Sequence, residues 1–302
     1  MTTEQTQKET KQDVSPTGIF QAIGVVTGDV QFIFQDDKNK YIANITIGQY
    51  QYNLYPIGSG SKSNAFNGLR KYIESTGISK QKLIVYPKVT HYPGKEQQHK
   101  IAFQLVAFEK QMVEDLIEKE VIESSVSREL NDFEFKLSGL WQFIPVCRTP
   151  CITVMKNFSD ERLQYIKQAE LTSKVNFMKA SHIPLIWKDA LVNPFRFNPK
   201  AEKEQQGKAM FVSIKARFIP GRDVFGFDSL VAIPQEEAPK YLKAGKKDKA
   251  EALKSKLANK RQNAGNEQIP QKVKPKVIVK KQDKTETSSA PEISKPKLKP
   301  KG

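Results

Sequence analysis

Apolar and polar residues alternate in short segments between residues 17 and 109, and this alternation predicts β structure. The segments are rich in Ile, Val, Phe and Tyr and are separated by Gly, Asp and Asn, as strands and turns are. Gly24 and Gly28 fall inside the first and longest segment, which predicts a bent or coiled strand there. We expect strands over residues 18–34, 40–47, 49–57, 83–89 and 100–108.

One stretch of this region follows the helical period instead. Phe66, Leu69, Tyr72 and Ile73 recur on one helix face, so residues 64–75 are expected to form a helix. The resulting order of three strands, one helix and two strands resembles that of the OB-fold, a curled and partly open barrel that commonly binds oligonucleotides. Small β-barrels of other topology give a similar order, and a fold alone does not settle function.

The β pattern begins again near residue 133 and resembles the first half. Three ordered matches favour an internal duplication, in which the second copy has a shorter middle and a helix near residues 160–169. A turn signature at residues 220–223 predicts an added hairpin with a return strand over 224–233. The matches pair residues 18–24 with 139–145, 83–85 with 185–187, and 97–103 with 205–211.

The chain is therefore expected to be mainly β with a few helices, and to contain two OB-like small β-barrels. An amphipathic helix, acidic on its exposed side, is expected to join them. The two ends of the chain are too polar to form a core and are expected to be disordered, apart from a basic helix over residues 239–260. The expected organisation is a disordered segment 1–16, a barrel 17–110, a linker helix 111–130, a second barrel 131–234 and a basic tail 235–302.

Positive charge is concentrated in the tail. The whole chain carries 49 Lys and Arg against 33 Asp and Glu, a net charge of +16. Residues 240–302 alone hold 19 basic and 6 acidic residues, which leaves the rest of the chain nearly neutral. A solvated block of like charge commonly meets a polyanion, either nucleic acid or an acidic membrane face. The tail has no Phe or Trp, which argues against a membrane-inserting helix.

Several classes of protein are not expected from this sequence. Residues 1–17 lack the apolar stretch of a secretory signal, and they contain acidic residues that transit peptides avoid. No apolar run approaches the ~20 residues of a membrane helix. Cys147 and Cys151 are the only cysteines, too few for a disulfide framework or a zinc site. We expect a protein of the cytoplasm, a reducing compartment, with no membrane partner.

Candidate catalytic groups are few. His91, His99 and His182 show no metal-ligand spacing. The first repeat match places both cysteines on apolar positions of the first strand, Val26 and Val30, which predicts small core residues rather than reactive thiols. We therefore expect no enzymatic activity, no metal and no cofactor.

Aromatic residues interleaved with basic ones indicate nucleic-acid binding, because rings stack on unpaired bases and cations follow the phosphates. The loop between the last two strands of an OB-like barrel is a usual ligand-binding element, and we place it at residues 89–99 and 193–207. Strand aromatics are also frequent in cores, so about half of those chosen are expected to be exposed. The candidate nucleic-acid-binding residues are Tyr50, Tyr52, Tyr86, Lys88, Tyr92, Trp187, Lys188, Arg196, Lys215, Arg217, Arg222, Lys246 and Lys247.

The preferred function is non-enzymatic binding of single-stranded DNA or RNA, with other nucleic-acid-processing proteins as further partners. The barrels would hold the bases while the tail adds electrostatic affinity. Two alternatives stay open. The nearly neutral body favours a protein–protein interaction or assembly module whose basic tail docks on a polyanionic complex. An enzyme acting on nucleic acid would use carboxylates such as Asp223 and Asp228 as metal ligands.

Overall fold

The chain divides into two units, Met1–Lys256 and Leu257–Gly302, and all strands of the described residues lie in the first of them. The structure is a computed structural model. It describes residues 18–36, 39–58, 64–94, 96, 99–110, 125–202 and 204–266.

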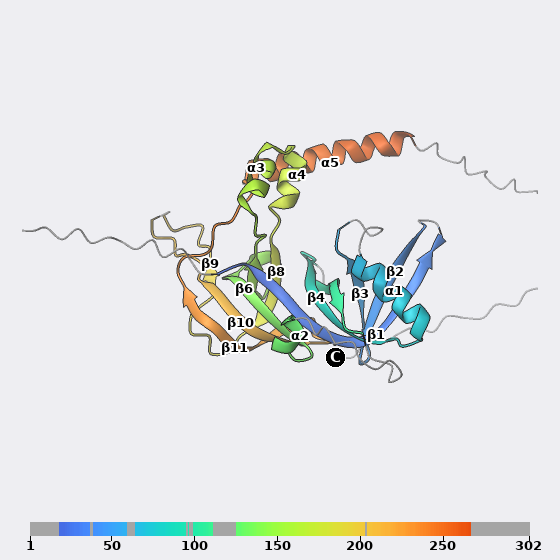
Figure 1. Cartoon of the computed structure of the whole chain (residues 1–302). Helices are drawn as coiled ribbons and strands as arrows, with labels where there is room; N and C mark the ends of the chain where they lie inside the picture. The colour runs from blue at the N-terminus through green and yellow to red at the C-terminus, as the bar shows by residue number, and fades with distance from the viewer. Residues whose placement is uncertain are drawn as a thin grey trace, which may run out of the picture. The chain divides into compact units, whose positions relative to one another are not determined.

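The N-terminal strands close into a five-stranded barrel (Figure 1). Neighbouring strands follow the order β1, β2, β3, β5, β4, and β4 pairs with β1 to complete the ring. All pairs are antiparallel except β3 with β5. Helix α1 contributes Phe66 and Leu69 to the core. The elements are β1 (Gln21–Gln35), β2 (Lys40–Ile47), β3 (Tyr50–Pro56), α1 (Asn64–Thr76), β4 (Lys80–His91) and β5 (His99–Phe108). The predicted strands, helix and OB-like architecture are confirmed here.

The second half repeats this strand order. The neighbours run β6, β7, β8, β11, β10, and β10 pairs with β6 to close the ring. The β8–β11 pair is parallel, like β3–β5 in the first barrel. A mainly β chain with two OB-like barrels is therefore confirmed. The elements are β6 (Glu134–Phe143), η3 (Pro145–Cys147), β7 (Pro150–Val154), α3 (Asp160–Gln168), α4 (Leu171–Phe177), β8 (Ser181–Ile186), β9 (Phe195–Arg196), β10 (Phe211–Ile219) and β11 (Val224–Gln235).

The equivalent positions of the two barrels differ from those expected. A Cβ atom on Gly28 would meet the carbonyl oxygen of Thr46 on the next strand, and one on Gly139 would meet that of Thr153. Because both glycines sit where the first strand of a barrel crosses the second, Gly139 corresponds to Gly28 and not to Gly18.

The other two repeat matches also join strands that are not equivalent. By strand order β8 takes the place of β3 rather than β4, and β10 takes the place of β4 rather than β5. The β10–β11 hairpin is accordingly the counterpart of β4–β5 and is not an addition. The duplication itself stays a prediction, now supported by topology instead of by these matches.

Strand β1 of the first barrel connects directly to the second barrel. The first residues of β1 pair with β6, the middle with β4 and the last with β2. Phe20, just before β1, packs on Leu140, Met155 and Phe211 of the second barrel. The blue strand β1 in Figure 1 accordingly runs from one barrel into the other. The predicted linker helix lies mostly outside the described residues, and α2 (Ser125–Glu129) is its described part.

A turn of the second barrel also inserts against the first. Gly221, in the β10–β11 turn, has φ +80° and donates its backbone N–H to the Tyr52 hydroxyl at 3.0 Å. A Cβ at Gly221 would strike the Tyr50 ring, so only glycine fits there. His99 Nε2 lies 2.6 Å from the Asp223 carbonyl oxygen in the same turn. Burial, reinforced by the Asp223 carboxylate, raises the pKa of Tyr52 to about 12.

Removing the Tyr52 hydroxyl is expected to weaken this contact. Tyr52→Phe leaves the Gly221 N–H without its partner, and it should lower the free energy of unfolding by about 1–3 kcal/mol. The matched control is Tyr55→Phe on the exposed side of the same strand, expected within about 0.5 kcal/mol of the parent. Urea unfolding measures both, and equal midpoints for the two variants would contradict the assigned role of Tyr52.

The C-terminal helix α5 (Lys246–Asn266) starts later than predicted. Residues 239–245 are not helical, and Gly245 precedes the first turn, where its carbonyl accepts the Lys249 N–H. Ala252 of α5 packs on Val175 of α4. The tail beyond residue 266 lies outside the described residues. No helix in the described part of the chain is long and apolar enough to span a membrane.

Candidate nucleic-acid interface

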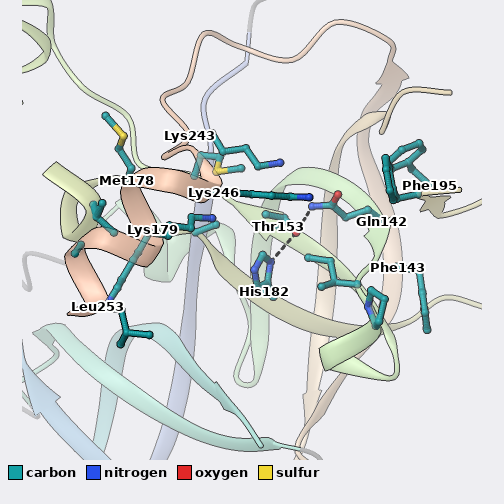
Figure 2. A pocket seen from close by; sticks show the side chains of 18 of the residues that line it. Gln142, Phe143, Thr153, Met178, Lys179, His182, Phe195, Lys243, Lys246 and Leu253 are labelled. Carbon is teal, nitrogen blue, oxygen red and sulfur yellow. Dashed lines mark hydrogen bonds between the residues drawn. The ribbon is translucent and has the colours of Figure 1, made fainter. Parts of the chain in front are cut away.

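One candidate site is a cavity of about 800 Å³ between the outer face of the second barrel and helices α4 and α5 (Figure 2). Its floor comes from β6, β7 and β8, and its rim from the segment after α4, from β9 and from the start of α5. We call it the lysine-rimmed cavity. Its lining includes Gln142, Phe143, Thr153, Met155, Val175, Met178, Lys179, His182, Phe195, Phe197, Lys243, Lys246, Lys249, Leu253 and Lys256.

Charge at this cavity has one sign. Five lysines line it, and no Asp or Glu side chain is among its described lining residues. The neighbouring His182 responds to this positive potential. Burial is the largest cause lowering the pKa of His182, and Lys249 and Lys243 lower it further. A cavity with this lining favours an anionic ligand.

Aromatic rings accompany the cations. Phe195 of β9 pairs with Gln142 of the neighbouring strand β6, so its ring lies beside that amide (Figure 2). Phe197 is 67% exposed, which leaves its ring open to a ligand. Arg196 lies over the Phe143 ring at 4.3 Å from its centroid. Rings and cations side by side are what stacking on bases and contact with phosphates require.

A row of polar side chains forms the floor. Gln142 Nε2 donates to Thr153 Oγ1 at 2.6 Å, and Thr153 Oγ1 lies 2.9 Å from His182 Nδ1. These three residues come from three adjacent strands, β6, β7 and β8, on the face that points away from the barrel core. Adjacent strands thus set the spacing of the row, while the Thr153 side chain is fully buried beneath the cavity.

The first barrel carries a second aromatic surface. Tyr55 of β3 and Tyr86 of β4 flank Gln104 of β5 in register on the outer face. Both tyrosines are more than a third exposed, and Lys88 Nζ lies 4.2 Å from the Tyr55 ring centroid. A cavity of about 730 Å³ adjoins Tyr55 at the ends of β2 and β3, with Tyr41 in its lining.

The structure brings together only some of the predicted site residues. Lys246 lines the lysine-rimmed cavity, Arg196 packs on the ring of Phe143, and Tyr86 and Lys88 share the outer face of the first barrel. Lys188, Arg222 and Lys247 are exposed elsewhere, and Tyr92 is half-buried. Sequence reasoning missed Gln142, Phe143, Lys179, Lys243 and Lys249, because their proximity depends on how helices α4 and α5 pack.

Several of those choices need correction. Tyr52 is 4% exposed and points into the core, so it cannot stack on a base. Tyr50 faces the Gly221 turn. One face of Trp187 is covered by Phe227, with ring centroids 4.5 Å apart and nearly parallel planes. The loop at residues 193–207 precedes β10, so it is not the counterpart of the β4–β5 loop.

Lys215 and Arg217 of β10 lie on a surface that contains carboxylates. Lys215 Nζ donates to the Glu129 carbonyl oxygen at 3.0 Å. Arg217 lies 3.7 Å from the Glu134 carboxylate. Neither residue is at the lysine-rimmed cavity.

The three histidines and both cysteines gather where the barrels meet. His91 Nε2 lies 2.8 Å from the His182 carbonyl oxygen and 3.6 Å from Cys147 Sγ. The Cys151 thiol, and then His91, lower the pKa of Cys147 to about 5, while the same pairing raises the pKa of Cys151. Both cysteines are fully buried, as expected of core residues, but their neighbours differ from those the repeat match implied.

No metal site is formed by these groups. Among the described residues, no cluster of three or more His, Cys, Asp and Glu side chains is arranged to hold an ion.

Comparisons with known proteins carry no argument about the fold or the function of this chain. No family model and no curated protein matches the chain. One solved structure that it resembles is a deletion mutant of the single-stranded DNA binding protein from Thermus aquaticus. The two share 9% identity, the match covers 73% of this chain and 94% of that one, and the TM-score is 0.31. That likeness is too distant to carry an inference about function, which must come from the geometry of the site.

Proposed function

We propose that this chain binds single-stranded nucleic acid without catalysing a reaction. The observation that carries the proposal is the lysine-rimmed cavity, where five lysines occur together with phenylalanine rings, that of Phe197 exposed, and with no carboxylate among the described lining residues. Phosphates supply the anionic charge that such a rim attracts, and unpaired bases supply the flat faces that rings stack on.

The first barrel supports the same function. Tyr55 and Tyr86 present rings on its outer face, with Lys88 beside them. Because bases inside a duplex are already stacked on each other, ring contacts of this kind favour unpaired strands. Two separate ring-and-cation surfaces, one on each barrel, fit one extended strand better than one small molecule.

A titration tests the proposal directly. A fluorescent oligonucleotide of about 30 nucleotides, enough to cover two OB folds, is titrated with the full chain across a salt series. We expect binding that weakens steeply with salt and that exceeds binding to the matching duplex. Absence of salt-sensitive binding, or equal affinity for duplex and single strand, would overturn the proposal.

Removing the tyrosine rings of the first barrel should weaken this binding. Tyr55→Ala and Tyr86→Ala are each expected to cost about 1–3 kcal/mol of binding free energy, the worth of one base stacked on a ring. Tyr165→Ala is the control, since Tyr165 is 57% exposed on α3 and belongs to neither surface. Fluorescence anisotropy at one salt concentration compares the three variants. A loss as large in the control would assign the effect to something other than stacking.

Protein docking is a second candidate, favoured by one observation. Strand β11 exposes apolar side chains along its second half, with Ile233 84% exposed and Leu230 and Val231 more than a third exposed. Exposed apolar strands of this kind serve as interaction surfaces. Nuclease treatment separates the two functions, because a partner bound through β11 stays bound after nucleic acid is digested.

A further inference from the structure

We infer that the lysine-rimmed cavity selects cytosine or adenine, through the amino group at N4 or N6, over thymine or uracil, and that the Gln142 amide makes the selection. This inference rests on the proposed function and specifies its ligand. It is carried by the polar row on the cavity floor, which general affinity for phosphates does not require.

The row fixes which end of the amide faces the ligand. Gln142 Nε2 donates to Thr153 Oγ1, so the Thr153 hydroxyl proton is free to donate to His182 Nδ1. Burial and the neighbouring lysines lower the pKa of His182, which favours the neutral imidazole at neutral pH, and we assign the acceptor role to Nδ1, the nitrogen that faces the Thr153 hydroxyl. The side-chain oxygen Gln142 Oε1 has no hydrogen-bond partner among the described residues, and it is the group left for a ligand.

The ring next to this amide brings a base within reach. Phe195 pairs in register with Gln142, so ring and amide stand on adjacent strands about 5 Å apart. Both line the cavity (Figure 2). A base stacked at Phe195 therefore has its edge beside Gln142.

An outward carbonyl oxygen distinguishes the bases. Cytosine offers the N4 amino group and adenine the N6 amino group as donors, and glutamine commonly reads adenine in this way. Thymine and uracil have an acceptor oxygen at the corresponding position, and two such oxygens repel each other. The amide thus strengthens binding of a base with an amino group at this position and weakens binding of a base with an oxygen there, while the lysines bind the phosphates of either.

Oligo(dC) and oligo(dT) of equal length test the inference, because both are pyrimidine strands. The measured quantity is the ratio of the affinity for oligo(dC) to the affinity for oligo(dT) at fixed salt and pH. We expect this ratio to be about threefold to tenfold higher in the parent chain than in Gln142→Met, which corresponds to one hydrogen bond. Thr153→Val should lose the same preference, since the amide is then no longer oriented. Gln205→Met, an exposed glutamine outside the cavity, should keep it.

A third probe is independent of any variant. In this oligonucleotide the 4-amino group of each cytosine is replaced by hydrogen, and the parent chain should bind it more weakly than oligo(dC). Two results overturn the inference while the proposed function stands. One is an unchanged ratio of the oligo(dC) and oligo(dT) affinities in Gln142→Met, and the other is equal binding of oligo(dC) and the probe with hydrogen at C4 by the parent. Failure of every probe to bind in a salt-sensitive way refutes the proposed function itself.

Discussion

Neutralising the lysine rim is expected to lower affinity for single strands about a hundredfold at ~0.1 M salt. The variant is Lys243→Gln, Lys246→Gln and Lys249→Gln together, which removes three charges from a cavity without carboxylates. Each lost phosphate contact reduces the slope of log affinity against log salt by about 0.7 for a single strand, so the slope should fall by about 2. Fluorescence anisotropy over a salt series measures both quantities.

The matched control removes three charges elsewhere. Lys71, Lys110 and Lys167 are exposed and lie outside both candidate surfaces. Replacing them with glutamine changes the net charge equally, so this control shows how much of the loss comes from overall charge. If the two triple variants lose affinity equally, the cavity has no special part in binding.

Truncating Phe135 is expected to destabilise the whole strand-bearing unit. Its ring, fully buried on β6, packs against Phe103 of the first barrel and against Phe218 and Phe225 of the second. Phe135→Ala should lower the free energy of unfolding by about 3–5 kcal/mol, from lost burial and the cavity left behind. Urea unfolding followed by tryptophan fluorescence and circular dichroism measures the change.

The two barrels should unfold in one transition in the parent chain, because this ring cluster and the pairing of β1 with β6 link them. Phe197→Ala serves as the control, since the exposed ring of Phe197 contributes little to the core. Its free energy of unfolding is expected within about 0.5 kcal/mol of the parent. Two separate transitions in the parent would show that the shared contacts do not couple the barrels.

Local patterns predicted the first barrel almost completely. Strand alternation and the helical spacing of Phe66 and Leu69 depend on neighbours in sequence, and those elements formed as expected. The alternation in β3 also separated Tyr52 and Leu54 from Tyr55 correctly. It could not say which set faces inward, since period two fixes the faces but not their burial.

Contacts between distant segments account for what sequence analysis missed. The pairing of β1 with β6 joins residues more than a hundred positions apart, and no local sequence pattern predicts it. Helix α4 was not predicted, and the cavity depends on its packing with α5. Of the candidate binding residues chosen from sequence, only Lys246 therefore lines the cavity, and the cavity floor was not predicted.

Strand β1 also has a consequence for how much of a polymer the chain covers. When two barrels are joined by a flexible linker, the distance between them can vary, and the length of nucleic acid that they cover varies with it. Here strand β1 of the first barrel pairs directly with β6 of the second, so the distance between the two stacking surfaces is expected to be fixed. The number of nucleotides occluded per molecule should accordingly stay constant while affinity varies.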